Sequence, residues 1–72
     1  MNIRIQVFPD FYIHIDVNET DTVEQFKIYV YNRLKIEPKN QYYVFNDLPF
    51  IDERELRDYG MYDNCSINLI KI

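Results

Sequence analysis

Glycine and alanine are nearly missing from this sequence of 72 residues, in which Gly60 is the only glycine and alanine does not occur. Loops that bind phosphate need several glycines, because their backbone N–H groups must approach the phosphate closely. A single glycine excludes such a loop. Cysteine is also scarce: Cys65 stands alone, so no internal disulfide and no cysteine metal cluster can form, which predicts a reducing compartment.

Long apolar runs are absent as well. The longest, Ile28-Tyr29-Val30-Tyr31 and Tyr42-Tyr43-Val44-Phe45, have four residues each, whereas a helix that crosses a bilayer needs about 20. An N-terminus that contains Arg4, Pro9 and Asp10 lacks the apolar stretch of about 7 to 15 residues that a secretory signal requires. The sequence therefore predicts no membrane insertion and a location in the cytoplasm or nucleus.

Basic residues are fewer than acidic residues in this sequence. Eight Lys and Arg residues stand against twelve Asp and Glu residues, which gives a net charge of −4 and an isoelectric point near 4.7. Phosphate backbones and anionic membranes attract positive patches, so we expect no nucleic-acid partner. The chain is instead rich in Ile, Asn, Tyr, Lys and Phe, which reflects either codon bias or selection for an adhesive surface.

The first 17 residues alternate between apolar and polar side chains, which is the period of a strand with one buried face. Pro9-Asp10 interrupts the alternation, as is typical of a turn between two strands. We therefore expect a hairpin whose apolar side chains share one sheet face: Ile3, Ile5, Val7, Ile13, Ile15 and Val17. Since about 100 to 200 residues are typical of one domain, residues 1–72 are expected to form a single domain.

From residue 22 the period changes to that of an amphipathic helix. The apolar stripe consists of Val23, Phe26, Val30 and Leu34. Thr22 and Gln25 are spaced as a capping box, in which each residue satisfies a backbone N–H group of the other. Lys35 occupies the position after the helix where a left-handed conformation is usual, and Pro38 prevents continuation.

Short apolar runs and turn residues fill the second half of the chain. Residues 42–45 and 48–50 flank Asn46-Asp47, which tolerates the positive φ of a tight hairpin turn. Residues 52–55 are charged and are expected to form a solvated loop, and the alternation around Ile67 and Leu69 predicts a last strand. The expected order is β-β-α-β-β-β.

Catalytic chemistry has little support in this sequence. An active site needs a nucleophile, a base or a metal assembled from several groups within hydrogen-bonding reach. His14 and Cys65 are the strongest candidates, but nothing requires their strands to bring them together. The carboxylates of residues 52–58 are interleaved with Arg54 and Arg57, which favours a solvated loop. We expect no enzyme activity, no metal or other cofactor, and no small-molecule substrate.

An ordered set of residues closely resembles the ubiquitin family over the whole chain. The matching residues are Met1-Asn2-Ile3, Asp21-Thr22-Val23-Glu24, Lys27, Ile36-x-Pro38, Gln41, Asp52-x-Arg54-x-Leu56-x-Asp58-Tyr59 and Ile67-x-Leu69. The resemblance implies an α+β fold of the ubiquitin-like β-grasp type, in which a mixed sheet of about five strands wraps one helix. It also implies that the first and last strands are adjacent and parallel, and that Tyr59 is buried and holds the loop before the last strand.

Covalent attachment in this family uses a C-terminal Gly-Gly, whereas this sequence ends in Ile70-Lys71-Ile72. Lys27 matches a family lysine, but the two positions most used for building chains hold Leu48 and Asp63. We therefore expect a protein that acts without conjugation. Two alternatives stay open: a covalent modifier whose longer precursor supplies the glycines, and an adaptor similar to the small non-conjugated ubiquitin-like proteins of pre-mRNA splicing.

The resemblance also implies a docking surface on the outward side of the sheet. Phe8, Val44 and Ile70 match the family's apolar patch, and Asn68 stands where the family has a histidine. Tyr42, Leu48 and Ile72 replace basic side chains. The expected partner-binding residues are Phe8, Tyr42, Val44, Leu48, Asn68 and Ile70, with Ile28 and Tyr29 as a secondary surface on the helix. An enlarged apolar face favours burial by a protein partner, as a small subunit of a larger assembly.

Overall fold

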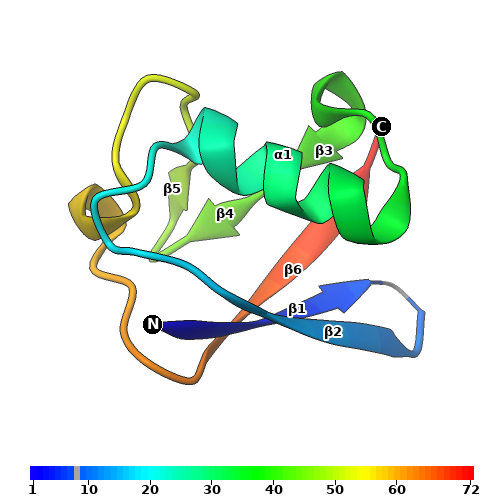
Figure 1. Cartoon of the computed structure of the whole chain (residues 1–72), viewed down its shortest axis with the longest axis horizontal. Helices are drawn as coiled ribbons and strands as arrows, with labels where there is room; N and C mark the ends of the chain where they lie inside the picture. Colours follow the sequence, from blue (N-terminus) through cyan, green and yellow to red (C-terminus); the bar gives the residue numbers. More distant parts are fainter. Residues whose placement is uncertain (8) are drawn as a thin grey trace.

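The computed structural model of the chain describes residues 1–7 and 9–72. The predicted anchor Phe8 lies outside the described residues. In chain order the strands and the α-helix are β1 (Asn2–Val7), β2 (Phe11–Asp16), α1 (Val23–Leu34), β3 (Gln41–Tyr42), β4 (Val44–Phe45), β5 (Leu48–Pro49) and β6 (Cys65–Lys71) (Figure 1). Two 3₁₀-helices, Pro38–Asn40 and Leu56–Tyr59, lie in the connections.

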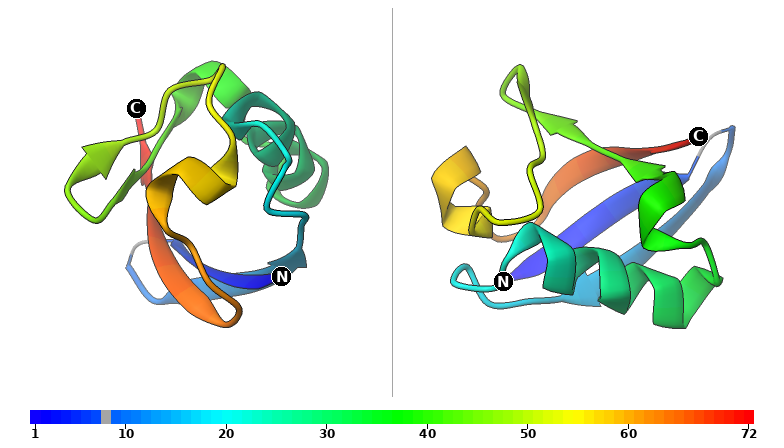
Figure 2. Two further views of the ribbon diagram at one scale, coloured as in Figure 1. Left: turned by 90° about the vertical axis from the view of Figure 1, so that its left-hand side faces the viewer. Right: turned by 90° about the horizontal axis from the view of Figure 1, so that it is seen from above.

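The main sheet has four strands in the order β2-β1-β6-β3. β1 pairs antiparallel with β2 and parallel with β6, where Ile3 lies opposite Cys65 and Val7 opposite Leu69. β4 and β5 form a separate two-stranded sheet. Helix α1 lies on one side of the sheet (Figure 2). The α+β arrangement and the adjacent first and last strands are confirmed, although the strands divide between two sheets.

The predicted strand at residues 42–45 divides at Tyr43, which lies between β3 and β4. Tyr43 is fully buried, and its carbonyl oxygen accepts a hydrogen bond from the N–H of Phe50 at 3.0 Å. β3 pairs with β6, whereas β4 pairs with β5. The chain changes partner strand at Tyr43, and this is why one apolar run forms two short strands.

The core fills the space between α1 and the inward side of the sheet. The helix contributes Val23, Phe26 and Val30, all fully buried, and Leu34 packs against them while partly buried. The aromatic rings pack edge-on or tilted, with centroid distances of 5.1 Å between Phe26 and Tyr43 and 4.5 Å between Phe50 and Tyr59. The predicted helical stripe is confirmed as the buried face.

Both predicted ends of α1 are confirmed. The N–H of Gln25 donates to Thr22 Oγ1 at 3.2 Å, and the N–H of Thr22 donates to Gln25 Oε1 at 2.8 Å, which completes the capping box. At the other end Lys35 has φ 59° and its N–H donates to the Tyr31 carbonyl at 2.7 Å. Lys35 therefore adopts the left-handed conformation that glycine adopts with less strain.

A polar pair is enclosed in this core. The Tyr43 hydroxyl donates to Gln41 Oε1 at 2.8 Å, while Gln41 Nε2 donates to the carbonyl oxygens of Lys27 at 2.9 Å and Ile36 at 2.8 Å. Gln41 thereby links the helix, the segment after it and β3. Burial raises the pKa of the Tyr43 hydroxyl above its ordinary value.

Tyr59 holds the loops that precede β6, as the resemblance implied. It is buried, its hydroxyl oxygen accepts from the N–H of Ile51 at 2.8 Å, and its carbonyl oxygen accepts from Asn46 Nδ2 at 3.0 Å. Asn46 and Asp47 have φ values of 53° and 63°, which confirms the predicted turn. These contacts fix the β4–β5 hairpin against the body of the protein.

Candidate protein-interaction face

Alternation along β6 places three of its side chains on the outward side of the sheet. Cys65, Ile67 and Leu69 are buried, so Ser66, Asn68 and Ile70 point away from the core. Tyr42 on β3 lies directly opposite Ile70, and directly opposed residues of antiparallel strands point to the same side. Tyr42 is 40% exposed and Ile70 46%, so the two form an accessible apolar pair.

Val44 continues this row. It lies two residues after Tyr42, and the antiparallel register of β3 and β6 brings it toward Asn68. Val44 is 39% exposed. Four of the six predicted partner-binding residues thus gather on one side of the sheet, and we call them the sheet face: Tyr42, Val44, Asn68 and Ile70.

Leu48 lies around the edge of this surface. It pairs with Phe45 across the β4–β5 hairpin, whereas Val44 pairs with Pro49. Because neighbouring residues of a strand point to opposite sides, Leu48 and Val44 occupy different sides of the hairpin. Leu48 also lines a hollow of about 180 Å³ together with Ile51 and Tyr59. It therefore extends the exposed apolar surface without joining the row of the sheet face.

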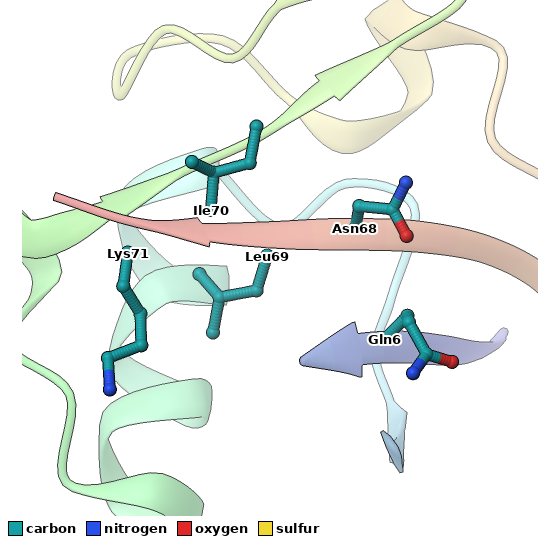
Figure 3. A pocket seen from close by; sticks show the side chains of 5 residues that line it. All are labelled: Gln6, Asn68, Leu69, Ile70 and Lys71. Atoms are coloured by element: carbon teal, nitrogen blue, oxygen red, sulfur yellow. The ribbon is translucent and has the colours of Figure 1, made fainter. Parts of the chain in front are cut away.

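A larger hollow of about 450 Å³ adjoins the sheet face. Among the described residues, Gln6 of β1 and residues 68–71 of β6 line it. Figure 3 shows Ile70 and Asn68 on one side of β6, and Leu69 and Lys71 on the other. The hollow offers space for an apolar side chain beside Ile70, with the Asn68 amide as a polar contact. The Gln6 amide is already engaged, because its Nε2 donates to the Phe11 carbonyl at 3.1 Å and its Oε1 accepts from Arg4 Nη2 at 3.5 Å.

The sheet face carries no charge. The charged residues that follow it in sequence lie elsewhere: Asp47 is in the hairpin turn, and Lys71 points to the other side of β6 (Figure 3). Farther along the outward side, Arg4 stacks over the Tyr12 ring at 4.2 Å, and His14 Nδ1 lies 3.0 Å from Asn2 Oδ1. An uncharged apolar row is thus bordered by polar and aromatic side chains and by the positive charge of Arg4.

Several exposed apolar side chains were not predicted from the sequence. Ile51, Phe11, Tyr12 and Tyr62 are all about half exposed or more, and the Tyr62 ring lies 6.3 Å from that of Phe45. Ile51 immediately precedes the charged loop and had no periodic pattern to mark it. Of these four residues, Tyr12 alone had a pattern that indicated exposure, because the alternation of the predicted hairpin places it on the outward side.

The secondary surface on α1 is also accessible. Ile28 is 45% exposed and Tyr29 is 37% exposed, and both lie outside the buried stripe of the helix. They are separated from the sheet face by the whole thickness of the core. Ile28 and Ile70 are the same residue type at nearly equal exposure, which makes them a matched pair for mutation.

The two candidate catalytic residues do not meet. Cys65 is buried on the inward side of β6, whereas His14 alternates to the outward side of β2. Two carboxylates of the charged loop are paired with basic side chains outside it: Asp52 with Lys27 Nζ of α1 at 2.7 Å, and Glu55 with Arg57 of the second 3₁₀-helix at 2.6 Å. These carboxylates are thus engaged in structural ion pairs.

Neither a metal site nor a membrane helix is found within residues 1–7 and 9–72. No three His, Cys, Asp or Glu side chains in these ranges gather closely enough to hold a metal ion. No helix in the same ranges has the length and apolar content needed to cross a bilayer.

A comparison with protein-family models matches residues 3–71 to the model described as the ubiquitin family. The match covers every strand and helix of the fold except the first residue of β1. A search of curated proteins finds no match to this chain.

Proposed function

Because this chain belongs to the ubiquitin family, a family that is generally non-enzymatic, we propose that it is a protein-interaction module that docks without covalent attachment through the sheet face. Tyr42, Val44 and Ile70 are the apolar anchors, Asn68 supplies a polar contact, and Leu48 extends the contact around the hairpin. Phe8 lies outside the described residues, and the resemblance alone supports it as a further anchor. The chain's proposed role is that of a small subunit of a larger assembly in the cytoplasm or nucleus.

The observation that carries this proposal is the accessible apolar row on a sheet whose other side is fully packed. Complete burial of a side chain of this size contributes about 1.5–3 kcal/mol. Tyr42, Val44 and Ile70 are already more than half buried, so the three together supply about 2–4 kcal/mol. Association costs at least about 4 kcal/mol. A stable complex therefore requires the hollow, Asn68 and Leu48 in addition to the three anchors.

Catalysis has no comparable support. His14 and Cys65 lie on opposite sides of the sheet, and the acidic groups Asp52 and Glu55 are held in ion pairs. A shared reaction centre needs groups within hydrogen-bonding reach of one another. Recognition through a surface is the chemistry that the arrangement favours.

Affinity purification of the tagged full chain from its native source tests the proposal. Val44→Asp places a carboxylate in the apolar row, and we expect it to reduce recovery of the specific partner at least about tenfold, since burying an unpaired charge costs more than 1.4 kcal/mol. Ile28→Asp is the control and should leave recovery unchanged. If Val44→Asp recovers the same proteins as the wild type, the sheet face is not the docking site.

The covalent alternative is tested in the same samples. Denaturing electrophoresis and intact mass measurement distinguish a docked chain, which is released at the mass of the tagged chain alone, from a chain joined by an isopeptide bond. An adduct that survives denaturation would show a modifier. The splicing-type adaptor is a second alternative, and spliceosomal proteins among those lost with Val44→Asp would favour it.

A further inference from the structure

We infer that the Arg33 side chain closes the outer edge of β2, and that without this contact the chain pairs through β2 with a second copy of itself. β2 is the last strand on its side of the main sheet, which has the order β2-β1-β6-β3 (Figure 1). An edge strand presents backbone N–H and C=O groups without a neighbouring strand, and another extended chain can pair with them. The inference is independent of the docking proposed for the sheet face.

The hydrogen-bond pattern shows which backbone groups of β2 point outward. Met1 and Val17 exchange two bonds, because the N–H of Val17 donates to the Met1 carbonyl and the Met1 ammonium donates to the Val17 carbonyl, both at 2.9 Å. Along antiparallel strands such pairs alternate with pairs that exchange no bonds. The register therefore makes His14 a residue without bonds to β1. Its N–H and C=O point away from the sheet, as do those of Tyr12 and Asp16.

The composition of β2 favours pairing with another copy of the same strand. Phe11–Asp16 contains aromatic and β-branched residues and a single carboxylate, with no proline, glycine or lysine. Segments of about six residues with this composition stack readily as strands. An antiparallel pair centred on His14 sets Asp16 of one copy opposite Tyr12 of the other, so the two carboxylates do not meet.

One side chain from outside the sheet covers this edge. Arg33, in the last turn of α1, donates from Nη1 to the His14 carbonyl oxygen at 3.0 Å. The bond lies at the centre of the outward row, between Tyr12 and Asp16, so an added strand must displace the guanidinium group before it can pair with β2. A basic residue at this position also suits the helix dipole, but the dipole does not require contact with β2.

The other strand edges are much shorter. β3, at the opposite edge of the main sheet, has two residues, and β4 and β5 have two residues each. Short edge strands offer few groups for pairing. Within the part of the chain that the structure describes, β2 is thus the long edge, and a helix side chain reaches the middle of it.

Sedimentation equilibrium at pH 8, where free imidazole is uncharged, tests the inference on the full chain. Arg33→Met keeps an unbranched side chain and removes every donor. At about 0.5 mM we expect the wild type to stay near 8.9 kDa. Arg33→Met should associate with a constant at least about tenfold larger, because a charged hydrogen bond in each copy no longer opposes pairing.

Two control variants separate the contact from the charge. Arg33→Lys keeps a cationic donor and should stay close to the wild type. Lys39→Met removes one positive charge from an exposed position outside the sheet, and it should also stay monomeric. Far-ultraviolet circular dichroism shows whether each variant is folded.

Two further measurements locate the contact. In Arg33→Met the backbone amide resonances of Tyr12, His14 and Asp16 should shift with concentration, while those of β6 stay constant. Adding His14→Pro removes the outward N–H, which a sheet edge tolerates, and should restore the monomer. If the double variant does not fold, the map of concentration-dependent shifts decides the location alone.

Three results would overturn the inference. The first is an Arg33→Met variant that stays monomeric at about 0.5 mM. The second is equal association of Lys39→Met, since charge alone would then account for the effect. The third is a set of shifts outside β2, or a wild type that already associates through β2, because Arg33 would then not close this edge.

Discussion

The buried pair of Tyr43 and Gln41 gives a quantitative prediction. Tyr43→Phe keeps the ring that packs against Phe26 and removes only the hydroxyl that donates to Gln41 Oε1. Gln41 is 3% exposed, so water cannot readily replace the lost donor. An unsatisfied buried acceptor costs about 1–3 kcal/mol. At about 2.1 cal/mol/K of unfolding entropy per residue, the melting temperature should fall by about 7 to 20 °C.

The same substitution should change the response to alkaline pH. Burial raises the pKa of the Tyr43 hydroxyl above its usual value near 10, so above pH 10 the folded chain holds a proton that the unfolded chain has released. The contribution to stability is complete below the unfolded pKa and is lost as the pH rises. At pH 11 the wild type should have lost about 1.4 kcal/mol through this group, whereas Tyr43→Phe loses none of it.

Urea unfolding followed by far-ultraviolet circular dichroism measures both effects. At pH 8 the wild type should be the more stable protein, and by pH 11 the difference from Tyr43→Phe should shrink by about 1.4 kcal/mol. Tyr62→Phe is the control, because Tyr62 is 63% exposed, and its curve should run parallel to the wild type. A difference between wild type and Tyr43→Phe that stays constant from pH 8 to pH 11 would refute the reasoning.

Two further predictions concern the ends of α1, and one given above concerns the surface. Thr22→Ala removes the hydroxyl of the capping box and should lower the free energy of unfolding by about 0.5–2 kcal/mol, measured in urea with the exposed Thr20→Ala as control. Lys35→Gly relieves the strain of a left-handed backbone and should raise the free energy of unfolding by up to about 1 kcal/mol. A lower melting temperature would contradict this. Val44→Asp should reduce docking, with Ile28→Asp neutral.

Residue patterns alone predicted the local elements of the fold. The spacing of Val23, Phe26 and Val30 defined the helix, Thr22 and Gln25 fixed its start, and Asn46-Asp47 predicted a tight turn, because each signal depends on neighbours in sequence. The parallel pairing of β1 with β6 came from the family resemblance only. Its contacts join residues about 60 positions apart, and no local pattern encodes such a pairing.

Tyr43 shows a second limit of prediction from sequence patterns. In the run of residues 42–45 every side chain is apolar, so alternation cannot tell which side faces the core. The structure buries Tyr43 and exposes Tyr42 and Val44. The polarity of Gln41 suggests exposure, yet it is buried because its amide satisfies the Lys27 and Ile36 carbonyls. The family resemblance grouped Leu48 with Val44. Only the pairing register of β4 with β5 shows that the two side chains lie on different sides of the hairpin.

The central place of β1 in the sheet has a consequence for biosynthesis. Ile3 lies opposite Cys65 and Val7 opposite Leu69, so β1 has no partner on that side until residues 65–69 have been translated. Bringing together ends about 60 residues apart costs roughly 3.6 kcal/mol of chain entropy beyond a constant term. The β1–β6 contacts that offset this cost cannot form in a shorter nascent chain. A ribosome that stalls before residue 65 therefore leaves the edge of β1 unpaired and the apolar face of α1 exposed. Chaperones and proteases can bind both.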